Sequence, residues 1–446
     1  MNIFIFRRDL RIVDNTSLHL LKETYRTTKI LPIFIFNEKQ IDKDKNKYYS
    51  HNAAQFLFES LDELPFLNFY YTNDDISVLQ ELKNRFTIKA IGFNRDYTPF
   101  AIKRDEEIKK WCLKNKIALI NEEDYTLHKI GAIMKDNNTP YQKFTPFYKK
   151  AIIKKPPAII KTTDYDFIKD SKALSDVSFL RPTINTKIKV NGGRNKALAI
   201  LKRLKENYFK DYDEERNYPY LDKTTKLSAY IKFGCISIRE VYYSLPVNHG
   251  IVRELIWRDF YANIAFFFPY IFNNSFIKKY DKIKWDYNER LFNCWKTGTT
   301  GFPLIDASMR QLNECGWMHN RCRMVVASFL VKNLFIDWRK GEQYFASKLV
   351  DYDPSSNNGG WQWCASTGTD SQPYFRIFSP SAQLKKFDKD CLFVKKWIPE
   401  LKDVDNKIIH NWENKDYSNL NTKYPRPIIK IKETSKKFIE TFKREL

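Results

Sequence analysis

Residues 316–333 read GWMHNRCRMVVASFLVKN and residues 351–370 read DYDPSSNNGGWQWCASTGTD, and these two stretches hold the most unusual mixture of residues in the chain. In the first stretch, the spacing i, i+3, i+4 and i+7 connects four side chains of mixed character: Trp317, Asn320, Arg321 and Met324. In a helix, this spacing places all four on one face. Such a face suits a hydrated pocket with an aromatic floor, although a half-buried helix with a solvated arginine explains it equally well.

The second stretch carries two Asn, two Gly and two Trp between residues 357 and 363. This composition predicts a flexible polar turn that brings the backbone close to a flat group. A glycine-marked loop beside two core tryptophans is at least as good an interpretation.

Two further polar clusters lie upstream. The segment RELIWRDFY at 253–261 places Glu254, Trp257 and Arg258 on one helical face, where they could hydrogen-bond, stack on and ion-pair with a nucleotide. The alternative is a surface Glu–Arg pair, which would leave the indole exposed. The segment DKTTKLS at 222–228 could cradle a phosphate with its hydroxyl and N–H groups, or simply cap a helix.

Composition restricts the class of protein. The chain has 446 residues, enough for two domains, and a net charge of +23 that favours a nucleic-acid partner over a membrane surface. A purely solubilising role for the charge is the alternative. The seven cysteines are scattered and form no C-x-x-C pair, so we expect no disulfide framework, no metal site and a reducing, intracellular compartment. The apolar run 264–271 is too short to span a membrane, so a soluble protein is expected.

The first third of the chain alternates short apolar runs with helical segments, which predicts a doubly wound parallel α/β sheet. The expected helices cover 52–64 and 76–86, and the expected strands are Asn2–Phe6, Ile30–Phe36, Leu67–Tyr71 and Ala90–Phe93.

The remainder of the chain divides into two further parts. Residues 126–190 are rich in Pro and Lys and read as a long surface connection. Apolar residues then recur with helical spacing, so we expect an all-α domain. The predicted division is an α/β domain at 1–125, a linker at 126–190 and a helical domain at 191–446.

Five motifs stand in a fixed order along the chain: FRRDLRIVDN, ELIWRDFY, GWMHNRCRM, LFIDWRKGEQYF and NNGGWQWCASTGTDSQPYFRIFSPSAQ. In order and spacing, from Phe4 to about Leu401, they resemble the photolyase/cryptochrome family, with class I cyclobutane-dimer DNA photolyases the nearest group. The resemblance implies an N-terminal antenna domain and a helical domain that holds FAD. It also implies that reduced FAD absorbs blue light and passes an electron to a pyrimidine dimer flipped out of UV-damaged DNA, which splits the dimer.

The resemblance assigns roles to individual residues. The FAD-binding set is Tyr212, Thr224, Thr225, Lys226, Leu227, Ser228, Asp351, Tyr352, Asp353 and Asn357. The residues that contact the lesion or DNA are Arg216, Glu254, Trp257, Arg258, Asn320, Arg321, Trp363 and Gln383. Within these sets and their neighbours, the catalytic residues are Glu254, Asn320, Met324 and Asn357, the last placed beside flavin N5. The chain that carries electrons to the flavin is Trp285, Trp338 and Trp361.

Two positions depart from the family pattern. Ile251 stands where near relatives often have a flavin-contacting Trp, and Thr98 stands where relatives with a folate antenna can have an acidic residue. A second, antenna chromophore, folate or deazaflavin, is therefore left open.

Four alternatives to a cyclobutane-dimer photolyase are considered. A cryptochrome usually departs at the position of Asn357 and carries a long tail. A (6-4) photolyase has a His pair where this chain has His319 and Asn320, and helical geometry would turn His319 away from the lesion. A single-strand-preferring relative typically has Gln in place of Met324. The fourth alternative is a basic flavoprotein that binds DNA without catalysis. We expect a monomer.

Overall fold

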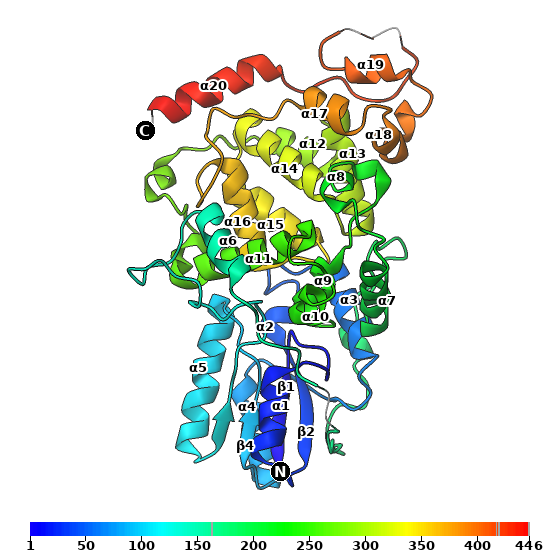
Figure 1. The fold of residues 1–446 in the computed structure, drawn as a ribbon. Coiled ribbons are helices and arrows are strands. Elements are labelled where there is room, and N and C mark those ends of the chain that lie inside the picture. The colour runs from blue at the N-terminus through cyan, green and yellow to red at the C-terminus, as the bar shows by residue number, and fades with distance from the viewer. Residues whose placement is uncertain (162–163, 416, 418–419, 445–446) are drawn as a thin grey trace.

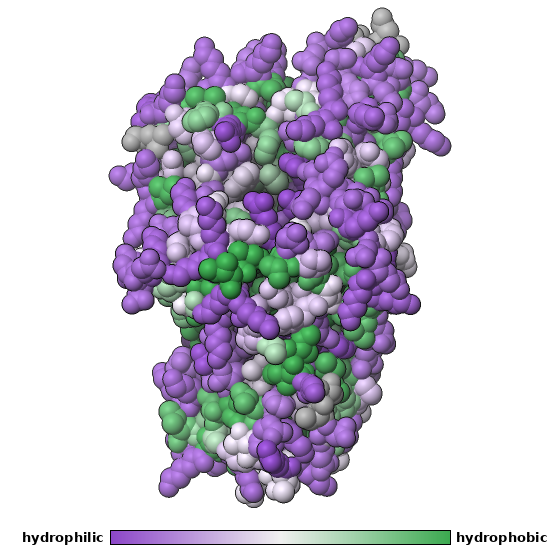
Figure 2. Space-filling view, in the orientation of Figure 1, coloured by the Kyte–Doolittle hydropathy of each residue, from purple (hydrophilic) through white to green (hydrophobic). Residues whose placement is uncertain are grey.

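The computed structural model describes residues 1–161, 164–415, 417 and 420–444. Figure 1 shows a sheet-containing part that carries the N-terminus and a larger helical part that carries the C-terminus at the opposite end of the molecule. Figure 2 shows a mostly hydrophilic surface with a few apolar patches. Within the described ranges, no helix combines the length and the apolar character needed to cross a bilayer.

The N-terminal part is built on a five-stranded sheet in the order β3-β2-β1-β4-β5, in which every neighbouring pair is parallel. The strands are β1 (Asn2–Phe6), β2 (Ile30–Asn37), β3 (Asn68–Thr72), β4 (Ala90–Gly92) and β5 (Ala118–Ile120). The first four strands confirm the prediction, whereas the short β5 was not expected. The central strands are buried on both faces, which explains their uninterrupted apolar runs.

The helices of this part are α1 (Thr16–Thr24), α2 (Glu38–Ile41), α3 (His51–Leu61), α4 (Asp75–Arg85) and α5 (Pro99–Lys114). The two predicted helices correspond to α3 and α4. Thr98 has a local role, because its side chain caps α5 by accepting a hydrogen bond from the N–H of Ala101.

The connection after β5 is not wholly irregular, as the sequence suggested. It contains the helix α6 (Phe144–Ile153) and a short 3₁₀ turn, Ser178–Leu180. Phe144, Phe147 and Ala151 form the buried face of α6, which packs on the long helix α11 (Gly250–Phe267). Pro146, one of the prolines of this Pro-rich stretch, lies in the first turn of α6, where proline costs no helical hydrogen bond.

The helical part surrounds α11, which is apolar on most sides and therefore central. Its other helices are α7 (Arg194–Lys205), α8 (Tyr212–Glu215), α9 (Leu227–Phe233), α10 (Ile238–Tyr242), α12 (Glu289–Thr297), α13 (Pro303–Cys315), α14 (Asn320–Ser328), α15 (Trp338–Lys348), α16 (Pro354–Ala365), α17 (Pro380–Phe387), α18 (Leu392–Trp397), α19 (Asn406–His410) and α20 (Ile431–Arg444).

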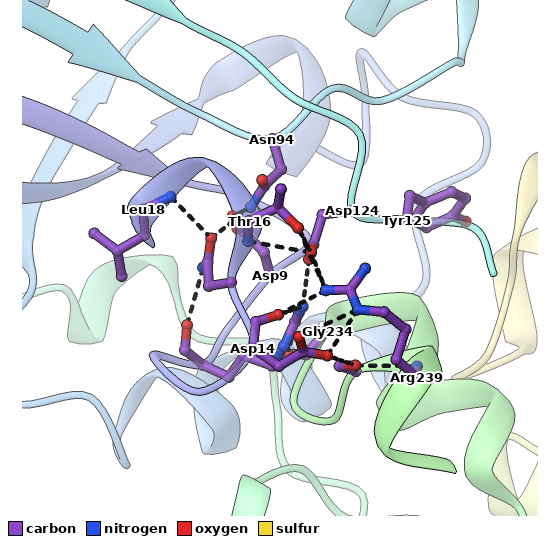
Figure 3. Close-up of polar contacts among 12 residues, drawn as sticks. Asp9, Asp14, Thr16, Leu18, Asn94, Asp124, Tyr125, Gly234 and Arg239 are labelled. Atoms are coloured by element: carbon purple, nitrogen blue, oxygen red, sulfur yellow. Dashed lines mark hydrogen bonds and ion pairs between the residues drawn. The ribbon is translucent and has the colours of Figure 1, made fainter. Parts of the chain in front are cut away.

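A buried polar network joins the two parts (Figure 3). From α10, Arg239 donates to Asp14, at 2.9 Å, and to Asp124, at 2.6 Å. Arg11 pairs with the other oxygen of Asp124. These side chains are at most 4% exposed, so the charges compensate each other where water cannot. The network fixes the loop after β1 and the segment after β5 against the helical part.

Candidate functional site

The helical part contains a cavity of about 520 Å³, a size typical of small-molecule sites. It brings together most of the residues singled out in the sequence. Those that line it are Tyr212, Arg216, Thr224, Thr225, Lys226, Leu227, Ser228, Glu254, Trp257, Arg258, Asn320, Met324, Asp351, Tyr352, Asp353, Asn357, Trp361 and Trp363. Those predicted for the site but absent from this lining are Arg321, Gln383, Trp285 and Trp338.

Helix α11 supplies one wall. Glu254 forms an ion pair with Arg216 of the segment after α8, so the alternative of a Glu254–Arg258 surface pair is wrong. Trp257 is half-buried, because its indole stacks on Phe144 with ring centroids 3.5 Å apart and planes within 5°. Glu254 and Trp257 of the predicted row are therefore each held at the cavity by a partner from another segment.

Arg258 is turned toward the junction with the N-terminal part. Its guanidinium lies 3.8 Å from the ring centroid of Tyr125 and donates to the carbonyl of the same residue. Tyr125 in turn donates to Asp353, which forms an ion pair with Arg8 at 2.8 Å. Burial alone would raise the pKa of Asp353, but the charges of Arg8 and Arg258 outweigh it and hold that pKa well below its ordinary value.

The stretch predicted to be a flexible turn is instead helix α16. Asp353 caps it by accepting from the N–H of Ser356 at 3.0 Å, and a proline occupies the first helical position. Gly359 serves packing, since a Cβ there would come within 2.2 Å of Tyr261 on α11. Gly360 lines the cavity, and a Cβ there would meet no atom within 4 Å. The glycines therefore bring two helices together and leave bare backbone facing the cavity.

Asn357 is held by helix α15. Its Nδ2 donates to the side chain of Glu342 at 2.9 Å and to the Glu342 carbonyl at 3.2 Å. Because both acceptors take the amide N–H groups, Oδ1 is left as the group that can accept a hydrogen bond from a ligand. Burial raises the pKa of Glu342 to about 7.

The segment 224–228 forms a polar end of the cavity. Ser228 donates to Asp351 at 2.7 Å, and Arg323 pairs with the same carboxylate at 2.9 Å. The Thr224 hydroxyl is buried, and among the described residues it has no hydrogen-bond partner. A bound ligand with acceptor oxygens at this end would satisfy it.

The prediction that Trp317, Asn320, Arg321 and Met324 share one helical face is wrong for two of the four residues. The helix begins at Asn320, so Trp317 precedes it, although Trp317, Asn320 and Met324 all line the cavity. Arg321 points elsewhere: it donates to Asn217 at 2.7 Å and lies 4.3 Å from the ring centroid of Phe387. An i+1 neighbour of Asn320 is rotated about 100° around the axis, which explains the divergence.

His319 caps α14 and accepts from the N–H of Arg321. The imidazole is buried outside the cavity lining, and burial together with nearby arginines lowers its pKa to about 4. At neutral pH it is therefore an uncharged structural cap.

The three tryptophans assigned to electron transfer lie at different depths. Trp361 lines the cavity, Trp338 is fully buried, and Trp285 is half-buried against Phe335 and against Phe442 of the C-terminal helix α20. Gln383 lies on α17, outside the cavity lining.

Sequence reasoning missed several lining residues, among them Arg323, Lys232 and Tyr261. Arg323 had a detectable signal, since it lies three positions after Asn320 on the same helix. Burial and the charge of Arg8 lower the pKa of Lys232 to about 7, but no feature of the local sequence marks that lysine. Ile251, the noted departure, also lines the cavity.

A family model described as the FAD binding domain of DNA photolyase matches residues 251–444, and one described as DNA photolyase matches residues 2–161. The deoxyribodipyrimidine photo-lyase of Buchnera aphidicola subsp. Acyrthosiphon pisum is 37% identical, over 99% of this chain and 97% of the relative. The chain belongs to the DNA photolyase family.

Solved structures of photolyases and a cryptochrome share the fold. An archaeal photolyase from Sulfolobus tokodaii, whose two FAD molecules imply a novel light-harvesting cofactor, is 38% identical with a TM-score of 0.87 over 100% of both chains. A Synechocystis cryptochrome is 25% identical with a TM-score of 0.87 over 99% of both chains. The predicted α/β plus all-α photolyase fold is confirmed.

The cavity fits the FAD of this photolyase family. The unpartnered Thr224 hydroxyl lies at the polar end, the bare backbone at Gly360 leaves room for a flat ring, and Asn357, whose Oδ1 is free to accept a hydrogen bond, also lines the cavity. The predicted FAD is confirmed as the cofactor of the domain. A folate or deazaflavin antenna stays a prediction.

Proposed function

We propose that this photolyase splits cyclobutane pyrimidine dimers in UV-damaged DNA under blue light, as a deoxyribodipyrimidine photo-lyase. One observation carries the proposal: a single cavity is lined by the segment 224–228, assigned to FAD, and by Glu254, Trp257 and Trp363, which are suited to a nucleotide. The curated relatives that share this fold over nearly their full length carry the same enzyme name.

The lesion side of the cavity has the groups that the reaction requires. Trp257 and Trp363 present flat apolar surfaces on which a dimer flipped out of the duplex can stack. Glu254, oriented by Arg216, provides a carboxyl group to hydrogen-bond the damaged pyrimidine. Asn320 and Met324 complete that side with a neutral amide and a polarisable thioether, whose groups contact at 3.7 Å.

FAD, when bound in its reduced form, supplies the light-absorbing group and the electron that opens the cyclobutane ring. The residues that would hold it are Tyr212, the segment 224–228, Asp351, Tyr352, Asp353 and Asn357, all of which line the cavity. Trp361 lines the cavity, Trp338 is buried and Trp285 is half-buried, and these different depths support their proposed role in supplying electrons to the resting flavin.

The cavity chemistry favours one lesion. A cyclobutane dimer splits without proton transfer, whereas a (6-4) product needs a donor that titrates near neutral pH. Among the described residues that line the cavity there is no histidine, and His319 is an uncharged cap outside it. The lining residue with a pKa near 7, Lys232, has Arg8, Asp351 and Asp353 as its charged neighbours, and these two carboxylates are assigned to FAD and not to the lesion.

The test uses two oligonucleotides, each with one lesion type, irradiated with the pre-reduced enzyme and analysed by chromatography for restored bases. Restoration of the cyclobutane dimer alone is expected. Restoration of the (6-4) product alone would overturn the choice of lesion, and restoration of neither would make the protein a photoreceptor of the cryptochrome type.

We also propose that the enzyme is a soluble, intracellular monomer that divides at about residues 125 and 190. Its seven free cysteines fit the reducing interior of a cell. The end of β5 at Ile120 and the start of α7 at Arg194 support these boundaries. Size-exclusion chromatography with light scattering tests the monomer, and limited proteolysis tests the boundaries.

A further inference from the structure

The seam between α6 and α11 borders the lesion side of the cavity. Phe144, the first residue of α6, stacks directly on Trp257 of α11. Figure 1 shows α6 lying beside α11, on which it packs. An exposed side chain one helical turn from Trp257 on α11 therefore lies close to the indole that lines the cavity.

Arg253 occupies that position. It lies four residues before Trp257 on α11, which places the two side chains on the same side of the helix, about 6 Å apart along the axis. Its side chain is exposed, and the guanidinium lies 5.7 Å from the ring centroid of Tyr148 and 5.9 Å from that of Phe144. The aromatic rings of α6 therefore hold the cation at the rim of the cavity.

Helix α6 adds positive charge beside Arg253. Residues 143–155 include five lysines and no acidic residue. Lys143 pairs with Asp370 at 3.6 Å, and Lys150 pairs with Asp136 at 2.9 Å. Lys149 is exposed, next to Tyr148, and within the described part of the chain neither Lys149 nor Arg253 has an ion pair.

The arginines inside the cavity are already engaged. Arg216 is neutralised by Glu254, Arg323 by Asp351, and Arg258 is held against Tyr125 at the junction of the two parts. The cations at the rim are thus the ones whose charge is available to a polyanion that approaches Trp257.

We propose that Arg253 and Lys149 form a phosphate-binding pair on the α6–α11 seam, which holds the backbone of the damaged strand next to the flipped dimer. The inference rests on the proposed repair of DNA and adds two phosphate-binding residues to it. A planar guanidinium on aromatic rings and a flexible ammonium on the neighbouring helix α6 suit phosphates of one strand, which they bind without reading sequence.

The test compares the wild type with Arg253→Gln, Lys149→Gln and the double variant on a duplex that carries one cyclobutane dimer. The dissociation constant is measured at several salt concentrations. Removing one cation that binds a phosphate should reduce the slope of log K against log salt by about 0.9, so the slope of the double variant should fall by about 1.8. Arg253→Lys should keep the slope, and Lys109→Gln on α5, an exposed lysine on the N-terminal part, is the matched control.

The FAD content of each variant and its yield of split dimer per bound complex should equal those of the wild type, because neither residue lines the cavity. If the wild type binds and repairs damaged DNA but the double variant keeps the full salt slope, the phosphate-binding pair is refuted and the proposed function stands. If the wild type shows neither lesion-dependent binding nor repair, the proposed function fails, and this inference fails with it.

Discussion

Asp353→Asn tests how strongly the N-terminal part holds helix α16, which lines the cavity, in place. The carboxylate pairs with Arg8, and the two side chains are 10% and 19% exposed. Removing one partner of a buried pair typically costs about 3–5 kcal/mol. Asparagine caps a helix as well as aspartate does, so the cap on α16 survives, and Arg8 keeps its second partner Asp96 at 3.2 Å. We therefore expect the lower end, a loss of about 3 kcal/mol in the free energy of unfolding.

The same substitution has a predictable pH dependence. The pKa of Asp353 is depressed in the folded protein, so its stabilising contribution is complete above the unfolded pKa of about 3.9. As pH falls further, toward the folded pKa, that contribution is lost. The difference between wild type and Asp353→Asn should thus be constant from pH 8 to pH 5 and shrink below about pH 4.

The assay is urea unfolding followed by circular dichroism in excess FAD, with the dissociation constant for FAD measured for each variant so that the stabilisation by the cofactor can be subtracted. The control is Glu433→Gln on α20, which breaks an exposed ion pair with Lys430. It should leave the urea midpoint unchanged. A loss of unfolding free energy below about 1 kcal/mol at pH 7 would refute the argument, because an exposed ion pair contributes no more than that. A difference between wild type and variant that stayed independent of pH down to pH 3 would refute it as well.

Glu254→Ala should lower the yield of split dimers and leave damaged-DNA binding largely intact, because its hydrogen bond matters most to the charged intermediate; equal yields of variant and wild type would contradict this. Trp285→Phe should block photoreduction of oxidised flavin, read from the flavin absorbance, and spare repair by chemically pre-reduced enzyme; a proportional loss of repair would disprove the assigned role. Gly359→Ala should lower the unfolding free energy by about 1–3 kcal/mol and reduce FAD content, since the new Cβ meets Tyr261 at 2.2 Å. An unchanged urea midpoint for Gly359→Ala would show that α16 and α11 can separate at no cost.

The parts of the fold that local pattern encodes could be predicted. The strands β1, β2 and β4 contain short apolar runs and β3 is rich in aromatic residues, and α3 and α4 have helical periodicity with N-caps at Ser50 and Asp74. The failures lie where tertiary contacts override local composition. The pair Gly359 and Gly360 suggests a turn, and only the approach of Tyr261 explains why a helix needs a glycine there. The Pro-rich stretch around Pro146 likewise suggests an irregular connection, yet the buried face of α6 on α11 stabilises a helix there.

The candidate site was predictable mainly through the family resemblance. Spacing on one helix could bring Glu254 and Trp257 together, but it could not show that Arg216 is the partner of Glu254, since that contact joins residues 38 positions apart. Nor could local sequence separate the neighbours Asn320 and Arg321, of which only the first lines the cavity. Their directions depend on where α14 begins and on the packing of Phe387 from another helix.

The apolar core does not stop at the boundary between the two parts. Phe4 and Phe6 of the central strand belong to the same buried cluster as Phe233 and Ile256 of the helical part. In evolutionary terms, the α/β unit is therefore not a removable accessory. A variant of this protein that bound no antenna chromophore would still need the sheet, because its strands complete the buried cluster on which helices of the cavity wall pack.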